Sequence, residues 1–294
     1  MTNYSFQFPV INGKIPIWKN NNFYLNDEIL KVLEYSVNNA GWTDELTEFH
    51  EETAGENHFI DTASRENALK QTQQYVQDKE STVILEVGCS SGFMLKTLRD
   101  AFPKSTVIGT DVVRAPLIKL SKEISNVPLL LFDLVNCPLP DNCVDAVVML
   151  NVLEHIENDL GALQQVMRIL KPGGVVVIEV PAGPNLYDIY DKILMHYRRY
   201  TLSSLQKQTE AAGFTITKKS HLGFFMYPGF WFVKQRNKRL SNESLAIQQQ
   251  EIEKNIQSTG DNKILHTLMR FELFLGKKIS YPIGIRCLMT CVKK

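Results

Sequence analysis

Short apolar runs alternate with helical patterns over the middle of the chain, from about residue 80 to residue 222. The runs are rich in β-branched residues and contain few polar positions, which is the pattern of strands buried on both faces. This alternation of strands and helices predicts a mostly parallel sheet with helices on both of its faces. We expect strands at residues 82–87, 106–110, 127–132, 144–150, 175–180, 214–220 and 285–292, the last of them after a long insertion.

Helices are predicted where apolar residues recur three and four positions apart. Met94, Leu98 and Phe102 form one such stripe, which Pro103 ends because proline cannot continue a helix. The Gln- and Asn-rich segment 236–263 is predicted to be either a solvated helix or a mobile insertion. Further helices are expected over residues 26–35, 64–77, 160–170 and 201–212.

Composition narrows the class of protein. Of the 294 residues, 44% are hydrophobic and 22% are charged, which is ordinary for a globular protein. Because 32 basic residues only balance 32 acidic ones, the chain lacks the basic surplus of a dedicated nucleic-acid binder. No apolar run reaches the ~18–20 residues of a membrane-spanning helix, and the N-terminus lacks the pattern of a secretory signal. We therefore expect a cytoplasmic protein.

The cysteines predict neither disulfides nor a metal site. Five cysteines are sparse for this length and odd in number, so no disulfide framework is implied. Cys287 and Cys291 lie four positions apart, but no neighbouring His or Cys supplies further ligands, so small buried apolar side chains are the favoured interpretation.

Charge and aromatic content divide the chain into regions. Residues 1–62 carry ten acidic and three basic side chains, and we expect this segment to form a cap on a single domain over residues 63–294. An insertion at about residues 223–280 begins with aromatic residues followed by Lys234 and Arg236. A helix packed on the core or on a second subunit is the favoured interpretation. Peripheral membrane contact through this insertion is the alternative.

The motif E-V-G-C-S-S-G at residues 86–92 ends a predicted strand and opens a predicted helix. Glycine at position 88 lets the chain turn tightly and lets a ligand approach the backbone. Amide groups at the start of the helix then point at whatever lies above the end of the strand. Taken alone, the motif is also compatible with an unliganded turn.

Two acids follow the next two strands. At the end of the second strand, Asp111 can accept hydrogen bonds from both hydroxyls of a ribose. Asp133 closes the third strand, where it can face an adenine amino group. Either acid alone is compatible with a strand-end cap. The glycine loop and both acids on consecutive strand ends favour a nucleotide-like cofactor.

The chain resembles the class I S-adenosylmethionine-dependent methyltransferases over roughly residues 58–222, with a weaker likeness to the end. A bacterial subgroup with undetermined or glycan- and lipid-related substrates has similar residues at His58-Phe59 ahead of Arg65, at Val180-Pro181-Ala182, at Asp191 and in H-Y-R-R-Y-T at 196–201. The sequence departs from the family at Ser90, where the middle glycine of the loop usually stands. The motifs that carry the resemblance are E-V-G-C-S-S-G (86–92), I-G-T-D-V-V (108–113), F-D-L (132–134), D-A-V-V-M-L-N-V-L-E-H-I (145–156) and L-K-P-G-G (170–174).

The resemblance implies an α/β, doubly wound, Rossmann-like seven-stranded sheet with an antiparallel last strand. It also implies an N-terminal helical cap, a helical insertion between the last two strands, and S-adenosylmethionine as cofactor. The residues it places around that cofactor are Glu86, Gly88, Cys89, Ser90 and Gly92 at the methionine part, Asp111 and Val112 at the ribose and one adenine face, Asp133 and Leu134 at the adenine edge, and Asn151 near the sulfonium.

Two histidines are the predicted catalytic residues. Methyl transfer needs an aligned acceptor, exclusion of water and removal of a proton where the acceptor carries one. His155 follows the fourth strand and can deprotonate a hydroxyl group, although a purely structural role is an equal alternative. His196 lies in a loop of aromatic and basic residues that is placed to close over the site.

Arg198, Arg199 and Tyr200 of the same loop are predicted to bind an anionic group of the acceptor, because arginine binds phosphates and carboxylates through two hydrogen bonds. The equal alternative is a structural lid in which the arginines pair with the acidic N-terminal segment.

The predicted function is transfer of a methyl group to a small-molecule or glycan- or lipid-linked acceptor, with oxygen as the expected atom. An NAD-dependent oxidoreductase is one alternative, because its glycine loop and ribose acid occupy similar places. A cofactor-binding partner protein that has lost catalysis is the other. The identity of the acceptor and the oligomeric state stay open.

Overall fold

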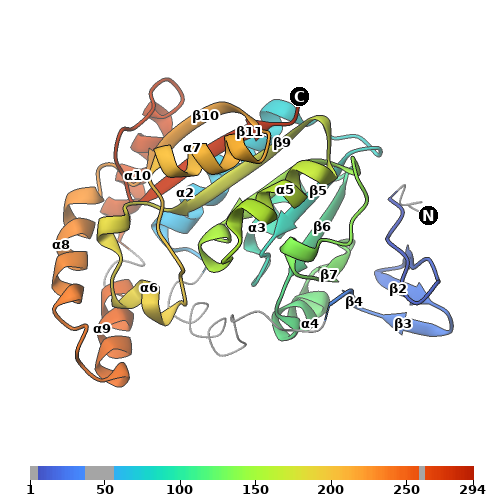
Figure 1. Ribbon diagram of the computed structural model, residues 1–294, viewed down its shortest axis with the longest axis horizontal. Helices are drawn as coiled ribbons and strands as arrows, with labels where there is room; N and C mark the ends of the chain where they lie inside the picture. The colour runs from blue at the N-terminus through green and yellow to red at the C-terminus, as the bar shows by residue number, and fades with distance from the viewer. Residues whose placement is uncertain (1–5, 37–55, 258–261) are drawn as a thin grey trace.

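The computed structural model describes residues 6–36, 56–257 and 262–294. They fold around one central sheet, with helices on both sides of it (Figure 1). A smaller sheet of three strands lies beside it near the N-terminus: β1 (Ile17–Lys19), β2 (Asn22–Leu25) and β3 (Glu28–Leu30). The strands of the central sheet, in order across it, are β10 (Thr215–Leu222), β11 (Arg286–Val292), β9 (Leu170–Pro181), β8 (Val144–Leu150), β5 (Val83–Val87), β6 (Thr106–Asp111), β7 (Leu129–Leu131) and β4 (Leu33–Glu34).

The pairing of these strands confirms the predicted topology. β5, β6, β7, β8 and β9 pair in parallel, whereas β11 runs antiparallel to both β9 and β10. The seven predicted strands are all present, and the short strand β4 adds an eighth by pairing in parallel with β7. β9 is longer than expected because it includes the L-K-P-G-G turn at its start.

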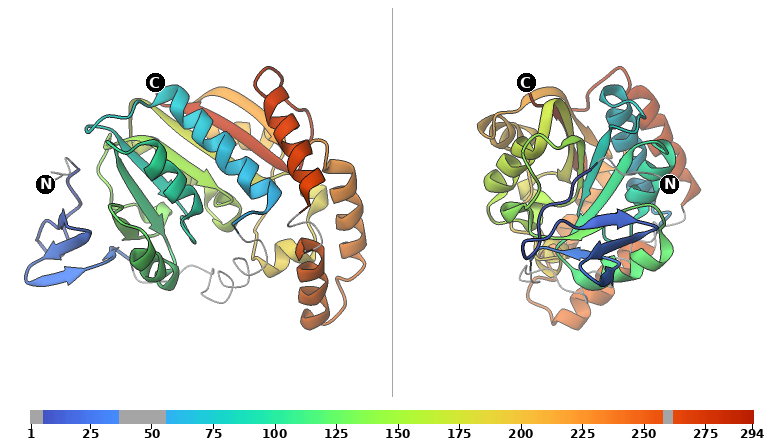
Figure 2. Two further views of the ribbon diagram at one scale, coloured as in Figure 1. Left: turned by 180° about the vertical axis from the view of Figure 1, so that it is seen from behind. Right: turned by 90° about the vertical axis from the view of Figure 1, so that its right-hand side faces the viewer.

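Helices cover both faces of the sheet. Alternate residues of each strand enter different cores, so that Leu85 lies in one cluster and its neighbour Ile84 in the other. One face packs against α5 (Asp159–Ile169) and α7 (Leu202–Ala211), and the opposite face packs against three further helices (Figures 1 and 2). Those helices are α2 (Phe59–Tyr75), α3 (Phe93–Ala101) and α4 (Arg114–Glu123).

The predicted N-terminal helical cap is wrong for residues 6–36. The segment 26–35 forms strands β3 and β4 instead of the expected helix. Asn26 adopts a left-handed φ of +57° in the two-residue turn that joins β2 to β3. Asparagine tolerates this conformation, which tight hairpins require, and this turn chemistry outweighs the weak helical spacing of the apolar residues.

The predicted boundary at residue 62 falls inside helix α2. This helix packs against β9 and therefore belongs to the domain built on the central sheet. Phe8, Trp18 and Phe23 of the N-terminal region share a core cluster with the sheet, so this region packs directly on the domain. Residues 37–55, which join the two parts, lie outside the described residues.

The insertion between β10 and β11 is helical, as predicted. It contains α8 (Tyr227–Lys238), α9 (Leu245–Gln257) and α10 (Lys263–Leu275). α10 lies alongside α2, as the view from behind shows (Figure 2). On α8, Lys234 is buried, whereas Trp231 and Phe232 are exposed.

Within the described residues, no helix is long and apolar enough to cross a membrane. Peripheral membrane contact through the insertion stays a prediction.

Candidate active site

The loops after β5, β6 and β7 meet at one edge of the sheet, because these parallel strands all end there. The N–H groups of Gly88 and Cys89 donate to the carbonyl of Thr110, at 2.8 and 3.0 Å. The N–H of Phe132 donates to the carbonyl of Asp111 at 3.2 Å. The fold therefore brings the predicted glycine loop and the two acids to one edge of the sheet.

The glycine loop needs its glycines for space and for conformation. Gly88 has φ +73°, and a Cβ there would lie 2.7 Å from Cγ2 of Val152. Gly92 has φ +74°, and a Cβ there would lie 2.4 Å from Cδ1 of Leu120. Ser90 also adopts a left-handed φ, +39°, which explains why glycine suits this position. A hydrogen bond from the N–H of Ser90 to Oδ2 of Asp111, at 2.9 Å, holds it there.

Glu86 is a buried acid with unused hydrogen-bonding capacity. It is 5% exposed, and its Oε2 has no hydrogen-bond partner among the described residues. Burial raises the pKa of its carboxyl well above the usual value, with a further increase from the charge of Asp111 and a decrease from Arg65. An unsatisfied carboxylate oxygen beside this loop fits the amino group of a bound S-adenosylmethionine.

The two strand-end acids are held by backbone amides. Asp111 Oδ1 accepts hydrogen bonds from the N–H groups of Val112 and Val113, at 2.8 and 3.0 Å. Asp133 caps the short 3-10 helix η1 (Leu134–Asn136) by accepting from the N–H of Val135 at 3.0 Å. Capping is thus one role of Asp133, and its contact with an adenine stays a prediction.

The remaining predicted cofactor residues lie at the same edge. The Cys89 side chain is buried among the core residues below the loop, so the loop offers a ligand the backbone there. Leu134 is buried after β7, and Val112 is partly buried after β6. Asn151 follows β8 with a left-handed φ of +54°, and its N–H donates to the carbonyl of Glu179 at 2.9 Å.

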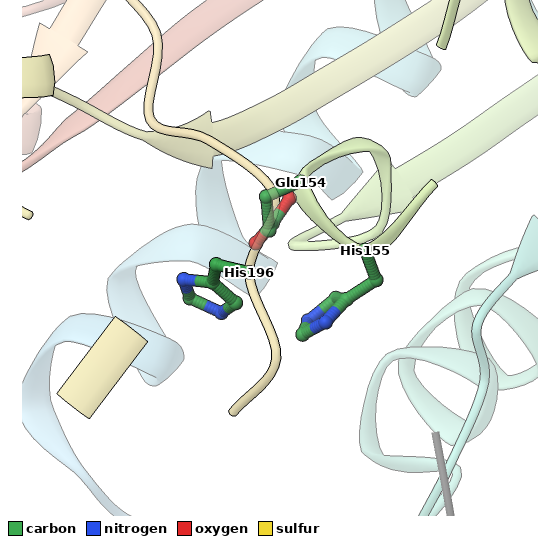
Figure 3. A group of neighbouring side chains, drawn as sticks. All are labelled: Glu154, His155 and His196. Atoms are coloured by element: carbon green, nitrogen blue, oxygen red, sulfur yellow. The ribbon is translucent and has the colours of Figure 1, made fainter. Parts of the chain in front are cut away.

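The two predicted catalytic histidines lie against each other (Figure 3). His155 ends the 3-10 helix η2 (Leu153–His155), which follows β8, and His196 follows the short helix α6 (Ile189–Ile193). Their ring centroids are 4.6 Å apart, with an angle of 76° between the ring planes. One ligand atom each from Glu154, His155 and His196 lies within 4.8 Å of the others, and we call these three residues the Glu-His-His cluster.

Glu154 is fully buried within this cluster. Neither of its carboxylate oxygens has a hydrogen-bond partner in the part of the chain that the structure describes. Burial raises the pKa of Glu154 to about 8. The sequence places Glu154 after the fourth strand, where it is expected to support loop amides rather than to react. Its position beside His196, 42 residues along the chain, is visible only in the structure.

Asp191 fixes the His196 ring from the other side. Its Oδ1 lies 2.7 Å from Nδ1 of His196 and also accepts a hydrogen bond from Nε of Arg199 at 2.7 Å. Burial alone would raise the pKa of Asp191, but the hydrogen bond to His196 and the charges of Lys234 and Arg199 hold it well below the usual value. Asp191 is therefore a carboxylate, so Nδ1 of His196 carries the proton and Nε2 keeps its lone pair.

The basic loop after His196 is anchored by internal contacts. Arg199 is 6% exposed and also donates to the carbonyl of Ala182 at 2.9 Å. The Tyr200 hydroxyl donates to Asp159 Oδ2 at 2.8 Å, and Arg198 pairs with the same carboxylate at 2.8 Å. Among the described residues, the acidic partners of the two arginines are Asp159 and Asp191. Much of the acidic N-terminal segment, which the other interpretation pairs with the arginines, lies outside the described residues. Of the two arginines, Arg198 keeps the more exposed side chain.

Comparison with known proteins agrees with the resemblance to methyltransferases that the sequence motifs show. Residues 85–178 match the family described as a methyltransferase domain. A protein of Mycolicibacterium smegmatis, described as a probable S-adenosylmethionine-dependent methyltransferase, is 30% identical over 144 residues, which cover 48% of this chain and 54% of that one. This chain thus spans about half the length of that relative.

Solved structures share the fold. Phosphoethanolamine N-methyltransferase 2 of Haemonchus contortus, in complex with S-adenosylmethionine, superposes with a TM-score of 0.54 at 17% identity and covers 85% of this chain and 57% of that one. Geranyl diphosphate C-methyltransferase of Streptomyces coelicolor superposes with a TM-score of 0.52 at 10% identity, over 80% and 79% of the two chains.

The strand order, the loops at the sheet edge and these matches define a class I methyltransferase fold. Residues 85–178 match the methyltransferase-domain family, and the similar proteins of known description include S-adenosylmethionine-dependent methyltransferases. The more specific bacterial subgroup that the sequence motifs suggest stays a prediction.

Proposed function

We propose that this protein transfers a methyl group from S-adenosylmethionine to an oxygen atom of a small-molecule or glycan- or lipid-linked acceptor. The observation that carries the proposal is the contact between the two halves of the site. Val152, which a Cβ on Gly88 would meet at 2.7 Å, lies three residues before His155. The 3-10 helix that ends in His155 therefore starts beside the loop that the family uses for its cofactor.

The residues at the sheet edge fit that cofactor. Bound there, S-adenosylmethionine supplies a methyl group on a positively charged sulfur, which is already a strong electrophile. The unsatisfied carboxylate oxygen of Glu86 suits its amino group, and Asp111 suits its ribose hydroxyls.

On the acceptor side, the two histidines account for the choice of oxygen. A hydroxyl group must lose its proton to become a good nucleophile, and imidazole is the side chain best suited to promote that loss near neutral pH. The pKa of His196 lies below the usual value, because burial lowers it more than the hydrogen bond to Asp191 raises it. The low exposure of Glu154 and His196 also keeps water from the reacting groups.

Two measurements test this proposal. Calorimetry is expected to show binding of S-adenosylmethionine, or of its demethylated product, and little binding of NAD. Incubation with labelled S-adenosylmethionine and a lysate fractionated into lipids, glycans and small metabolites is expected to label one fraction. Tight NAD binding without S-adenosylmethionine binding would identify an oxidoreductase. Cofactor binding with no labelled fraction would favour a partner protein without catalysis.

A further inference from the structure

Two features of the Glu-His-His cluster exceed what simple proton transfer requires. The first is the carboxylate of Glu154, which is fully buried and has no hydrogen-bond partner on either oxygen among the described residues. A buried carboxyl group without a partner is costly in its charged form, so a bound cation would stabilise the carboxylate. The second is the presence of two imidazoles beside it, from segments 41 positions apart (Figure 3).

We propose that Glu154, His155 and His196 bind a divalent transition-metal ion that keeps open coordination positions for the acceptor's oxygen. Two imidazoles and one carboxylate are a common ligand set for Zn²⁺ and Fe²⁺ sites that carry out catalysis. Mg²⁺ and Ca²⁺ prefer sites made of oxygen atoms alone, so the mixed set favours a transition metal. The part of this inference that concerns the acceptor rests on the proposed function, whereas the metal site does not.

The geometry of the cluster is close to that of a bound ion. One ligand atom of each residue lies within 4.8 Å of the other two. An ion about 2.1 Å from each ligand atom would bring these atoms to about 3–4 Å from one another, so the side chains must close by roughly 1 Å. His155 is only partly buried, so this side of the cluster is the one nearest to solvent.

Asp191 completes the arrangement from behind. Histidines that bind metals usually donate their other ring N–H to a carboxylate or carbonyl, which fixes the ring and makes the binding nitrogen more basic. His196 has this partner, because its Nδ1 lies 2.7 Å from Asp191 Oδ1. Arg199 and the buried Lys234 hold Asp191 in turn. Nε2 of His196 is thereby left to bind the ion.

The charges around the cluster leave a place for a cation. Arg199 is already paired with Asp191 at 2.7 Å, and Arg286 is paired with Glu179 at 2.6 Å. Neither guanidinium makes a hydrogen bond to the carboxylate of Glu154. A bound dication would supply the charge that this carboxylate lacks. An acceptor hydroxyl on an open position of the ion would have a lowered pKa and would lose its proton to water at the partly exposed His155 side of the cluster.

Metal titration of the full chain, without a polyhistidine tag and after dialysis against a chelator, tests the inference. Zn²⁺ is followed by calorimetry, Co²⁺ by its visible absorption, and stoichiometry by elemental analysis. We expect one ion per chain. We expect Glu154→Gln, His155→Ala and His196→Ala each to weaken binding by more than the ~10–100-fold that loss of an outer carboxylate partner costs.

His221→Ala and Glu272→Gln are matched controls. Both residues are buried away from the cluster, where His221 contacts the carbonyl of Tyr281 and Glu272 accepts from the N–H of Gly223. These variants are expected to bind Zn²⁺ as the wild type does. Calorimetry with the demethylated cofactor checks that every variant is folded.

The outcomes separate the metal site from the proposed function. Much less than one ion bound to the wild type, or unchanged binding in a His155→Ala/His196→Ala double variant, would overturn the inference. Undiminished methyl transfer by metal-free protein would also overturn it and would leave the proposed function standing. One tightly bound ion, lost in the cluster variants, with no transfer to any fraction would support the metal site and refute the proposed function.

Discussion

The proposed cofactor side and the proposed acceptor side of this site are built in different ways. On the cofactor side, the glycine loop and Asp111 are tied to neighbouring strands by backbone hydrogen bonds, such as those from Gly88 and Cys89 to Thr110. On the acceptor side, buried charged side chains from distant segments hold His196, with Asp191, Arg199 and Lys234 in one network. The cofactor side thus depends on backbone geometry, and the acceptor side depends on paired charges.

This difference predicts how each half fails. A change in the backbone at the sheet edge is expected to affect cofactor binding and stability together. A change in the Glu-His-His cluster is expected to affect the chemical step and to leave the sheet edge intact. Additivity of distant sites makes the separation measurable, since changes in residues that share no partners usually combine independently.

The largest effect is expected for His155→Ala. Removal of this ring takes away a group that promotes loss of the acceptor's proton, so kcat is expected to fall by about 10²–10⁴-fold. The affinity for S-adenosylmethionine is expected to stay near that of the wild type. Steady-state kinetics and calorimetry measure the two quantities, and His221→Ala is the control. A loss restricted to stability or to cofactor affinity would assign His155 a structural role.

Gly88→Ala is expected to damage the cofactor side. Its Cβ would lie 2.7 Å from Val152 Cγ2, and its φ of +73° is strained for any residue with a side chain. We expect a loss on the order of 1–3 kcal/mol in unfolding free energy, together with weaker cofactor binding. Denaturant titration and calorimetry measure these changes.

Gly173→Ala separates strain from collision. Gly173 has a similar φ of +80°, but a Cβ there would meet no atom within 4 Å. This control is expected to lose stability through backbone strain alone and to keep its cofactor affinity. Equal losses of affinity in both variants would contradict a specific role for the close approach of Gly88 to Val152.

Asp111→Ala is expected to act on the cofactor and not on the cluster. Loss of hydrogen bonds to the ribose hydroxyls is expected to weaken binding of S-adenosylmethionine by roughly 1–3 kcal/mol. The same carboxylate also holds Ser90, Val112 and Val113, so some loss of loop order is included in this figure. Zn²⁺ affinity is the matched readout, and a parallel loss of metal binding would mean that the two halves are coupled.

The same contrast explains which features could be predicted from the sequence. The strand ends and the glycine loop leave local patterns and were predicted from them, whereas the antiparallel direction of the last strand was implied by the family resemblance. Glu154 and Asp191 stand out in the sequence only as a residue after the fourth strand and as part of the family resemblance. Their contacts with His196 depend on the tertiary fold, which no local pattern encodes. The hairpin turn at Asn26 was missed for a different reason, because its left-handed conformation competes with a weak helical spacing over the same residues.

The smallest effects are expected for Arg198→Lys and Arg199→Lys. These two variants test whether Arg199 has a structural role while Arg198 binds the acceptor. Arg199 joins Asp191 to the carbonyl of Ala182 through two different nitrogens, and a lysine cannot reproduce this planar fork. Arg199→Lys is therefore expected to lower the unfolding free energy by about 1–2 kcal/mol, the cost of a charged hydrogen bond in a buried place.

Arg198 has the more exposed side chain, and its pair with Asp159 is expected to contribute less than about 1 kcal/mol to stability. If Arg198 recognises an anionic group of the acceptor, Arg198→Lys is expected to raise the acceptor KM while melting temperature and cofactor affinity stay unchanged. Added salt is expected to raise that KM further in the wild type, because partly exposed charge pairs are screened. Kinetics with the acceptor, at two salt concentrations and on both variants, gives the answer. An acceptor KM at the wild-type value in Arg198→Lys would show that the basic loop only anchors the site, since Arg199 is already committed to Asp191.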